Sequence, residues 1–339
     1  MPLISEIDLN ILNHLASAPS NINVDPVKVK AAISGSLSIS DLIINQICSA
    51  LNSGKHIILS GPPGTGKTTL AFAVAKVAQG IDPMVTTATA DWTTFDTVGG
   101  YMPDLTSSNT NALKFELGIV LQSIVNRQWL IIDEVNRTQI DKSIGQLFTV
   151  LSDGNALLPH RSSKTGNRIN IISGNGQNTD DTFYKTDDWR LIATMNEFDK
   201  TSLFDMSYAF MRRFAIIRVG VPENYDSEVS NWASRLNTDL VDILKLIAKK
   251  TEDMAIREIG PATIKSLISY LESRSTIDSE YSQHLAEGLA LYLLPQFQGL
   301  DDSEIHKLWD LVKTFISRDP KALKYFINNV KAVLDCELT

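Results

Sequence analysis

The feature that most constrains this chain is a glycine-rich segment that begins at Gly61 and ends at Thr68. It reads Gly-Pro-Pro-Gly-Thr-Gly-Lys-Thr and matches the pattern G-x-x-x-x-G-K-[ST]. An apolar run, His56–Ser60, precedes it and a helical pattern, Thr69–Ala78, follows it, so we predict a strand, a tight loop and a helix in succession. Backbone N–H groups of such a loop surround phosphate oxygens, and the helix N-terminus adds a favourable dipole. The segment therefore predicts a site for nucleotide phosphates.

Two side chains of this loop carry its chemistry. Lys67 is placed to reach the β- and γ-phosphates, and the hydroxyl of Thr68 is placed to coordinate Mg²⁺. The alternative, a glycine-rich turn that binds nothing, is disfavoured by the strand–loop–helix context. The residues that we expect to bind the nucleotide are Gly61, Pro62, Pro63, Gly64, Thr65, Gly66, Lys67, Thr68 and Thr69.

A pair of adjacent carboxylates, Asp133 and Glu134, ends a second apolar run, Trp129–Asp133. We expect Asp133 to hold Mg²⁺ through water and Glu134 to polarise the attacking water. The alternative is a solvated strand terminus. A phosphate loop upstream and a buried strand immediately before the pair favour the catalytic interpretation.

Two polar features accompany later strands. Asn196 closes the run Trp189–Met195 at the edge where α/β sheets bind ligands, so it could orient the lytic water; an asparagine in an ordinary turn fits the pattern equally well.

Arg212 and Arg213 directly precede the run Phe214–Val219. Arginines there can stabilise transition-state charge on a phosphoryl group, in this chain or in a neighbour. From the pattern alone, solvated surface charge is the simpler interpretation.

The order of elements predicts an α/β domain followed by an all-helical domain. Helical stretches separate most of the apolar runs, which predicts a five-stranded parallel sheet. The predicted strands are His56–Ser60, Pro83–Ala90, Trp129–Asp133, Trp189–Met195 and Phe214–Val219. After Pro222 the strand signals fade, and a composition shift after a proline indicates a domain boundary. The predicted helices beyond it are Ser227–Leu236, Leu240–Lys249, Ala262–Leu271, Ser282–Leu294, Ser303–Phe315 and Lys321–Leu334.

We accordingly expect three parts. Residues 1–40 form an N-terminal helical extension, residues 41–221 the α/β nucleotide-binding core, and residues 222–339 a helical lid with a helical extension.

Two long stretches, at about 91–111 and 157–188, interrupt the core and are not needed for its alternation of strands and helices. Loops of this length are usually functional or mobile. Because both interrupt the nucleotide domain, we favour a functional insertion over dispensable surface.

Composition limits the partners. The chain of 339 residues has a formal net charge of −8 and no basic tail, which makes autonomous binding to DNA or membranes unfavourable. No apolar run approaches the ~20 residues of a membrane span, and the N-terminus lacks a secretory pattern. Cys48 and Cys336 have no metal-ligand spacing and fit a reducing compartment, so we expect a cytoplasmic protein. The five histidines show no zinc spacing.

The succession of motifs resembles the AAA+ ATPases. The segments that carry the resemblance are GPPGTGKTTLA, WLIIDEVNR, TMN and YAFMRRF, followed by a helical domain. Among these ATPases, the chain is most similar to the branch of MoxR-type chaperones, dynein-like modules and the GTP-dependent restriction motor McrB. Four segments resemble that branch's DEINR, G-E-L, MNTADR and DYALRRRF: Asp133–Arg137, Gly145–Leu147, Met195–Lys200 and Ser207–Phe214. The resemblance covers roughly Leu42 to Leu271.

The resemblance implies roles for the later residues. Asn196 would sense the γ-phosphate, and Arg212 and Arg213 would act as fingers on the adjacent protomer. It also implies self-association into a ring, usually a hexamer, and ATP rather than GTP by family frequency alone. A second sensor arginine is expected near Gly260–Lys265, but the matching positions hold Ala262 or Thr263. Lys265 or Arg257 would be the substitutes.

Three functions remain open at this stage. The first is an oligomeric ATPase motor that remodels a partner protein, as MoxR-like chaperones do. The second is a motor that drives a separate nuclease on DNA in a defence system, as McrB does. The third is a slow nucleotide-dependent switch or scaffold, against which the intact Glu134 and Asn196 argue.

Overall fold

The computed structural model describes residues 22–104, 113–197, 206–248 and 258–338. This part of the chain divides into two compact units. The first unit runs to Gly61 and continues from Lys67 to Val219; the second comprises Pro62–Gly66 and the chain from Gly220 onward. The division along the chain at Val219 lies two residues before the boundary expected from the sequence.

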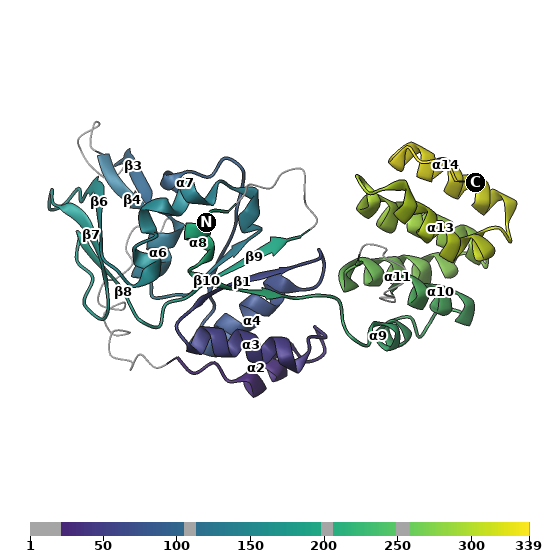
Figure 1. The fold of residues 1–339 in the computed structure, drawn as a ribbon, viewed down its shortest axis with the longest axis horizontal. Coiled ribbons are helices and arrows are strands. Elements are labelled where there is room, and N and C mark those ends of the chain that lie inside the picture. Colours follow the sequence, from purple (N-terminus) through teal and green to yellow (C-terminus); the bar gives the residue numbers. More distant parts are fainter. Residues whose placement is uncertain (1–21, 105–112, 198–205, 249–257, 339) are drawn as a thin grey trace. The chain divides into compact units, whose positions relative to one another are not determined.

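A five-stranded parallel sheet forms the centre of the first unit (Figure 1). Its strands are β1 (His56–Gly61), β2 (Met84–Thr87), β5 (Leu130–Asp133), β9 (Leu191–Asn196) and β10 (Phe214–Arg218). They follow the order β10-β1-β9-β5-β2, and every neighbouring pair is parallel. The predicted α/β fold with a five-stranded parallel sheet is therefore confirmed. All five strands end at the same edge, where ligands bind in sheets of this kind.

Helices cover both faces of this sheet, which explains why its strands are continuous apolar runs rather than alternating ones. Ile57 and Leu59 belong to one buried cluster with the first group of helices, whereas Ile58 belongs to a second cluster on the opposite face. The first group is α2 (Pro26–Ile33), α3 (Asp41–Asn52) and α4 (Lys67–Gln79). The second face carries α6 (Ile119–Val125), α7 (Ile140–Ile144) and α8 (Tyr208–Met211) (Figure 1).

The two insertions form small sheets of their own where they are described. The first contains α5 (Thr94–Thr97) and the hairpin strands β3 (Gly99–Pro103) and β4 (Leu113–Leu117). The second contains β6 (Ala156–Arg161), β7 (Arg168–Ser173) and β8 (Thr182–Lys185). The Tyr101 hydroxyl accepts the Arg161 N–H at 2.8 Å and donates to the Arg161 carbonyl at 3.2 Å. The described parts of the two insertions are thus joined to each other. Short 3-10 turns complete the unit: η2 (Val135–Arg137), η3 (Gly145–Leu147) and η4 (Val150–Ser152).

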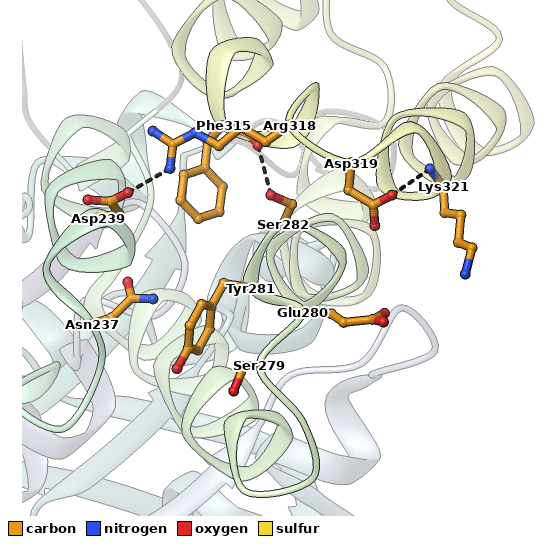
Figure 2. A pocket seen from close by; sticks show the side chains of 10 residues that line it. All are labelled: Asn237, Asp239, Ser279, Glu280, Tyr281, Ser282, Phe315, Arg318, Asp319 and Lys321. Carbon is orange, nitrogen blue, oxygen red and sulfur yellow. Dashed lines mark hydrogen bonds and ion pairs between the residues drawn. The ribbon is translucent and has the colours of Figure 1, made fainter.

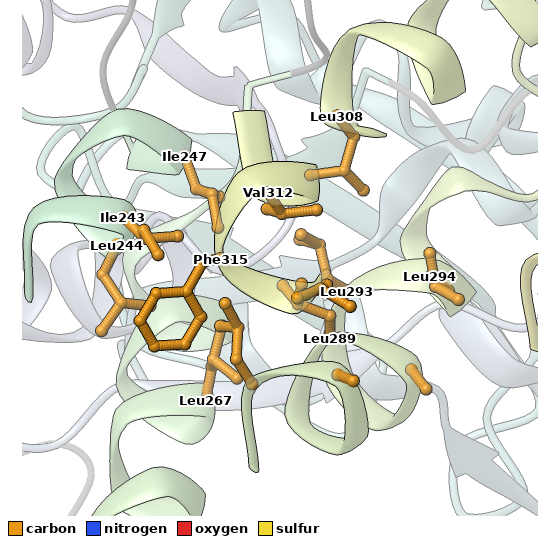
Figure 3. Packing of buried hydrophobic residues seen from close by; sticks show 14 of the residues in the cluster. Ile243, Leu244, Ile247, Leu267, Leu289, Leu293, Leu294, Leu308, Val312 and Phe315 are labelled. Carbon is orange, nitrogen blue, oxygen red and sulfur yellow. The ribbon is translucent and has the colours of Figure 1, made fainter. Parts of the chain in front are cut away.

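The second unit is helical around its own apolar core. Its elements are α9 (Tyr225–Trp232), α10 (Thr238–Ala248), α11 (Pro261–Ser275), α12 (Tyr281–Gly288), η5 (Leu289–Leu293), η6 (Leu294–Phe297), α13 (Asp302–Ile316) and α14 (Pro320–Leu334). Figure 3 shows Leu267 of α11, Leu289 of η5 and Val312 of α13 meeting in this core. Asp301 and Asp319 accept backbone N–H groups at the starts of α13 and α14, which fixes where these helices begin. The helical character predicted after Pro222 is confirmed.

Three further observations concern the described residues alone. Cys48 and Cys336 are buried free thiols. No group of three or more histidine, cysteine, aspartate or glutamate side chains gathers as a metal site within the described ranges. None of the helices described here has the length and apolar character needed to cross a membrane.

Candidate functional site

The phosphate loop leaves β1 at a position where only glycine fits. Gly61 has φ +147°, and a Cβ atom there would lie 2.2 Å from the Val219 carbonyl oxygen. Lys67 opens α4, is 6% exposed, and its Nζ donates to the Gly61 carbonyl at 3.1 Å. The loop therefore places the lysine ammonium beside the end of β1, as the motif predicts.

Burial changes the acidity of this lysine. Desolvation lowers the pKa of Lys67 from 10.5 to about 8, although the carboxylates of Asp133, Glu197 and Glu134 oppose the shift. The buried Lys67 side chain attracts an anion only in its protonated, positively charged form. Phosphate oxygens at this position would restore the solvation that burial removed.

Asp133 lies at the end of β5, beside the start of α4. The Thr68 hydroxyl donates to Asp133 Oδ1 at 2.6 Å, and the Thr194 hydroxyl of β9 donates to the same oxygen. This brings together the two residues that the sequence assigned to Mg²⁺. Carboxylate and hydroxyl oxygens are the ligand types that Mg²⁺ prefers, so the donor set fits that ion. Thr194 was not predicted; a polar residue two positions before Asn196 in an apolar strand was the available signal.

Glu134 follows directly and adopts an uncommon backbone conformation. Its φ and ψ are 55° and 44°, in the left-handed region that non-glycine residues seldom occupy. The Asn196 amide donates to Glu134 Oε1 at 3.2 Å, and Arg137 Nε lies 2.8 Å from Oε2. The structure thus brings the predicted water-polarising carboxylate into contact with the predicted γ-phosphate sensor. Strained backbone of this kind is concentrated at functional sites.

The sequence analysis missed two other polar residues near the end of β9: Asn136 of η2 and Glu197, which follows β9. The buried Asn136 donates from its amide to the Asn196 carbonyl at 3.2 Å. The Glu197 carboxylate accepts from the Ser60 hydroxyl and from Arg218, each at 3.1 Å. Glu197 stands where the similar loop of McrB has threonine, and this departure was the signal available. Phe198, Asp199 and Lys200, which complete the predicted loop, lie outside the described residues.

The two candidate finger arginines have different environments. Arg213 Nε donates to the Phe148 carbonyl at 2.8 Å, and its guanidinium lies over the Phe148 ring at 4.9 Å. A second bond joins Arg213 to the Ala209 carbonyl. Arg212 is exposed, and within the described part of the chain its guanidinium makes no hydrogen bond or ion pair. Among the described residues, Arg213 is therefore engaged by its own chain, whereas Arg212 is exposed.

Within the second unit, the middle of the phosphate loop meets the start of α11. The Ala262 N–H donates to the Gly64 carbonyl at 3.1 Å, and the Thr65 hydroxyl donates to the Pro62 carbonyl at 3.1 Å. Lys265, a suggested substitute for the second sensor, instead lies over the Trp232 ring at 4.4 Å. Arg257, the other substitute, lies outside the described residues. The contact at the expected sensor position is thus made by backbone.

A separate hollow of about 430 Å³ lies among the helices of the second unit (Figure 2). Its lining includes one ion pair, in which Arg318 donates to Asp239 at 2.6 Å, and Asp319 accepts the backbone N–H of Lys321. The residues predicted from the sequence are not among its lining residues. We therefore place the chemistry at the sheet edge.

A parallel α/β sheet with a glycine loop, a buried lysine, a threonine–aspartate pair and a glutamate–asparagine pair at its carboxyl edge defines a P-loop nucleoside triphosphatase. Residues 56–214 match the family model of the AAA domain, dynein-related subfamily. These residues therefore form an AAA domain of the dynein-related type, and the chain is similar to AAA+ ATPases of that branch.

Two similar proteins extend the comparison. The McrB subunit of the type IV methyl-directed restriction enzyme of Escherichia coli K12 is 27% identical over 191 residues, which are 54% of this chain. The match spans only 39% of that relative's length. A solved structure of a candidate ATPase from Cytophaga hutchinsonii aligns over 97% of this chain and 90% of its own, with 16% identity and a TM-score of 0.41. The family assignment rests on the family match and the site geometry.

Proposed function

We propose that this chain is a Mg²⁺-dependent ATP hydrolase that works as an oligomeric motor, with each site completed by an adjacent copy. The observation that carries the proposal is the contact between Glu134 and Asn196 beside the Thr68–Asp133 pair. These four side chains come from three different elements and meet at one edge of the sheet. The arrangement supplies a metal-binding oxygen pair next to a water-polarising carboxylate.

Hydrolysis then follows from what each residue can do. Thr68 and Asp133 would hold Mg²⁺, which supplies positive charge to the phosphate oxygens when it is bound. Lys67 binds the β- and γ-phosphates. Glu134 accepts a hydrogen bond from the attacking water and increases its nucleophilicity, while Asn196 orients that water toward the γ-phosphorus. Fixed electrostatics, rather than covalent chemistry, lowers the barrier.

Arg212 is the finger that we assign to the adjacent copy's site. Its guanidinium is exposed, whereas Arg213 is bonded to the Phe148 carbonyl of its own chain. A cation supplied by a neighbour makes turnover depend on assembly, because the isolated site lacks one charge that stabilises the transition state. The ring, usually a hexamer, is proposed on the same basis and on the family resemblance.

We propose two alternatives for the molecule on which the motor acts. The first is a partner protein that the ring remodels. The second, favoured by the likeness to the McrB restriction subunit, is a separate nuclease that the ring drives on DNA. The net charge of −8 supports the first form, because contact with DNA phosphates requires clustered cations.

Steady-state phosphate release tests the proposal. ATP and GTP are compared with Mg²⁺ present or chelated, and with no addition, single-stranded DNA or duplex DNA. Turnover that requires Mg²⁺ supports the hydrolase, and stimulation by DNA selects the nuclease-driving form. Turnover that is indifferent to DNA selects protein remodelling, and the absence of nucleotide binding contradicts the site.

A further inference from the structure

The Glu197 side chain joins the ends of three strands. Ser60, at the end of β1, donates its hydroxyl to Glu197 Oε1 at 3.1 Å. Arg218, at the end of β10, donates from Nε to both carboxylate oxygens at 3.1 Å. Glu197 itself follows Asn196, the last residue of β9. One carboxylate therefore links the phosphate-loop strand, the sensor strand and the last strand of the sheet.

The backbone repeats the same connection. The Glu197 N–H donates to the Gly61 carbonyl at 3.2 Å, and the Lys67 ammonium donates to that same carbonyl at 3.1 Å. The Val219 N–H donates to the Ser60 carbonyl at 2.7 Å. A movement of Glu197 would therefore reach Lys67 through the shared carbonyl and β10 through Arg218. Beyond Val219 the chain continues into the second unit.

The exposure of this ion pair argues against a purely stabilising role. The Glu197 side chain is 25% exposed and the Arg218 side chain is 46% exposed. Pairs that are exposed to this degree contribute little to the free energy of folding. Their geometry, with one nitrogen shared by two carboxylate oxygens, instead restricts where the carboxylate can lie.

We propose that Glu197 is a positioning residue that couples the γ-phosphate sensor Asn196 to β10, with Arg218 as its anchor. This inference rests on the proposed nucleotide site. When Asn196 engages the γ-phosphate, Glu197 moves with it, and the Arg218 contact carries that movement to the strand that leads into the second unit. Loss of either partner leaves the nucleotide bound but loosens Asn196 and Glu134 from their reacting positions.

The test compares Glu197→Gln, Arg218→Gln and the double variant, each measured for binding of a fluorescent ATP analogue and for turnover per bound nucleotide. We expect each single variant to lower kcat by about tenfold, because small displacements in a site of this kind are costly. The double variant should lie within ~twofold of the singles, since both changes break one connection. KM should change little in either variant, because neither side chain is assigned a contact with the nucleotide.

A matched control and a conservative variant separate coupling from folding. Glu116→Gln breaks a comparable exposed pair with Lys114 on β4 and should leave kcat and KM unchanged. Arg218→Lys keeps the positive charge and should recover part of the lost kcat. Unchanged turnover per bound nucleotide in the two Gln variants, or additive losses in the double variant, would overturn the coupling. Failure of the unmodified chain to bind ATP would instead contradict the nucleotide site.

Discussion

Carboxylates cluster in two regions of the molecule, the carboxyl edge of the sheet and the contact between α11 and α12. The two regions differ in the groups that donate hydrogen bonds to these carboxylates. In the helical unit, Asp278 pairs with Arg274 at 2.6 Å and lies 2.6 Å from His284 Nε2. Glu287 accepts from Arg274 at 3.0 Å and from the Tyr270 hydroxyl at 2.7 Å. These contacts hold the pKa of both carboxyls below their usual range, although burial opposes the shift for Glu287.

At the sheet edge, the partners are mostly groups that a ligand can replace. Asp133 accepts from two hydroxyls, and Glu134 accepts from an amide and pairs with the half-exposed Arg137. A hydrogen bond between a hydroxyl and a carboxylate can be replaced by bonds to a metal ion with little loss of free energy. Moving Arg274 away from Asp278 and Glu287 would instead leave two carboxylates without their cation. The comparison teaches that the helical network stabilises a fold, while the sheet edge is prepared for a ligand.

The largest effect is expected from Lys67→Ala. It should weaken ATP binding by more than about 100-fold, because it removes the buried cation that faces the phosphates. Isothermal titration of ATP against the variant measures the loss. Lys76→Ala, on the exposed side of the same helix, is the control and should bind normally. Normal ATP binding by Lys67→Ala would contradict the assignment of the sheet edge, rather than the α11–α12 contact, as the ligand site.

Arg212→Ala should lower turnover by about 10³-fold with ATP binding retained, because a finger acts on transition-state charge. Arg213→Ala should instead lower the melting temperature, since it removes the contacts with Phe148. Phosphate release and thermal unfolding separate the two. Mixing Arg212→Ala subunits with Glu134→Gln subunits should restore some activity if sites are shared; no rescue at any ratio would exclude sharing.

Glu134→Gln should keep ATP binding and lower kcat by about 10²-fold or more, because the amide cannot accept the proton of the attacking water. A single-turnover assay with bound ATP measures this step directly. The substitution preserves shape and can still accept from Asn196, so the melting temperature should stay constant. A large fall in the melting temperature would indicate that Glu134 stabilises the fold, as Asp278 and Glu287 do.

Glu287→Gln should have the opposite profile. It weakens the bonds to Tyr270 and Arg274 and should reduce the free energy of unfolding by about 1–2 kcal/mol. Turnover per folded molecule should not change. Chemical denaturation followed by phosphate release tests both halves of this expectation, and a changed kcat at equal folded concentration would contradict it.

The smallest expected effects are those of pH, and they also differ between the regions. Because the pKa of Lys67 is lowered to about 8, kcat/KM for ATP should fall as pH rises through about 8, where the ammonium loses its proton. The pKa values of Asp278 and Glu287 are lowered, so their stabilisation is present above their unfolded values of roughly 4 and is lost as pH falls below them. A pH–rate profile and acid unfolding curves measure these trends.

The sequence predicted the sheet, the helical unit and most of the site because these signals are local. Consecutive apolar residues such as Ile57, Ile58 and Leu59 specify a strand that is buried on both faces, whatever lies around it. The carboxyl edge follows from parallel strands, so the meeting of Asn196 with Glu134 was implied once both strands were placed. The predicted loop character of 157–188 was incomplete, because β6, β7 and β8 alternate only partly between buried and exposed positions.

By itself, then, the sequence determined the nucleotide loop, the acidic pair and the order of elements, since backbone conformation and phosphate chemistry depend on neighbouring residues along the chain. Only the tertiary structure separated the two adjacent arginines, because Arg213 is bonded to Phe148, which is 65 positions away. It alone brought Glu197 to Ser60 and Arg218, residues whose spacing carries no pattern. Contacts of this kind depend on strand order, and strand order is set by the packing of the whole sheet.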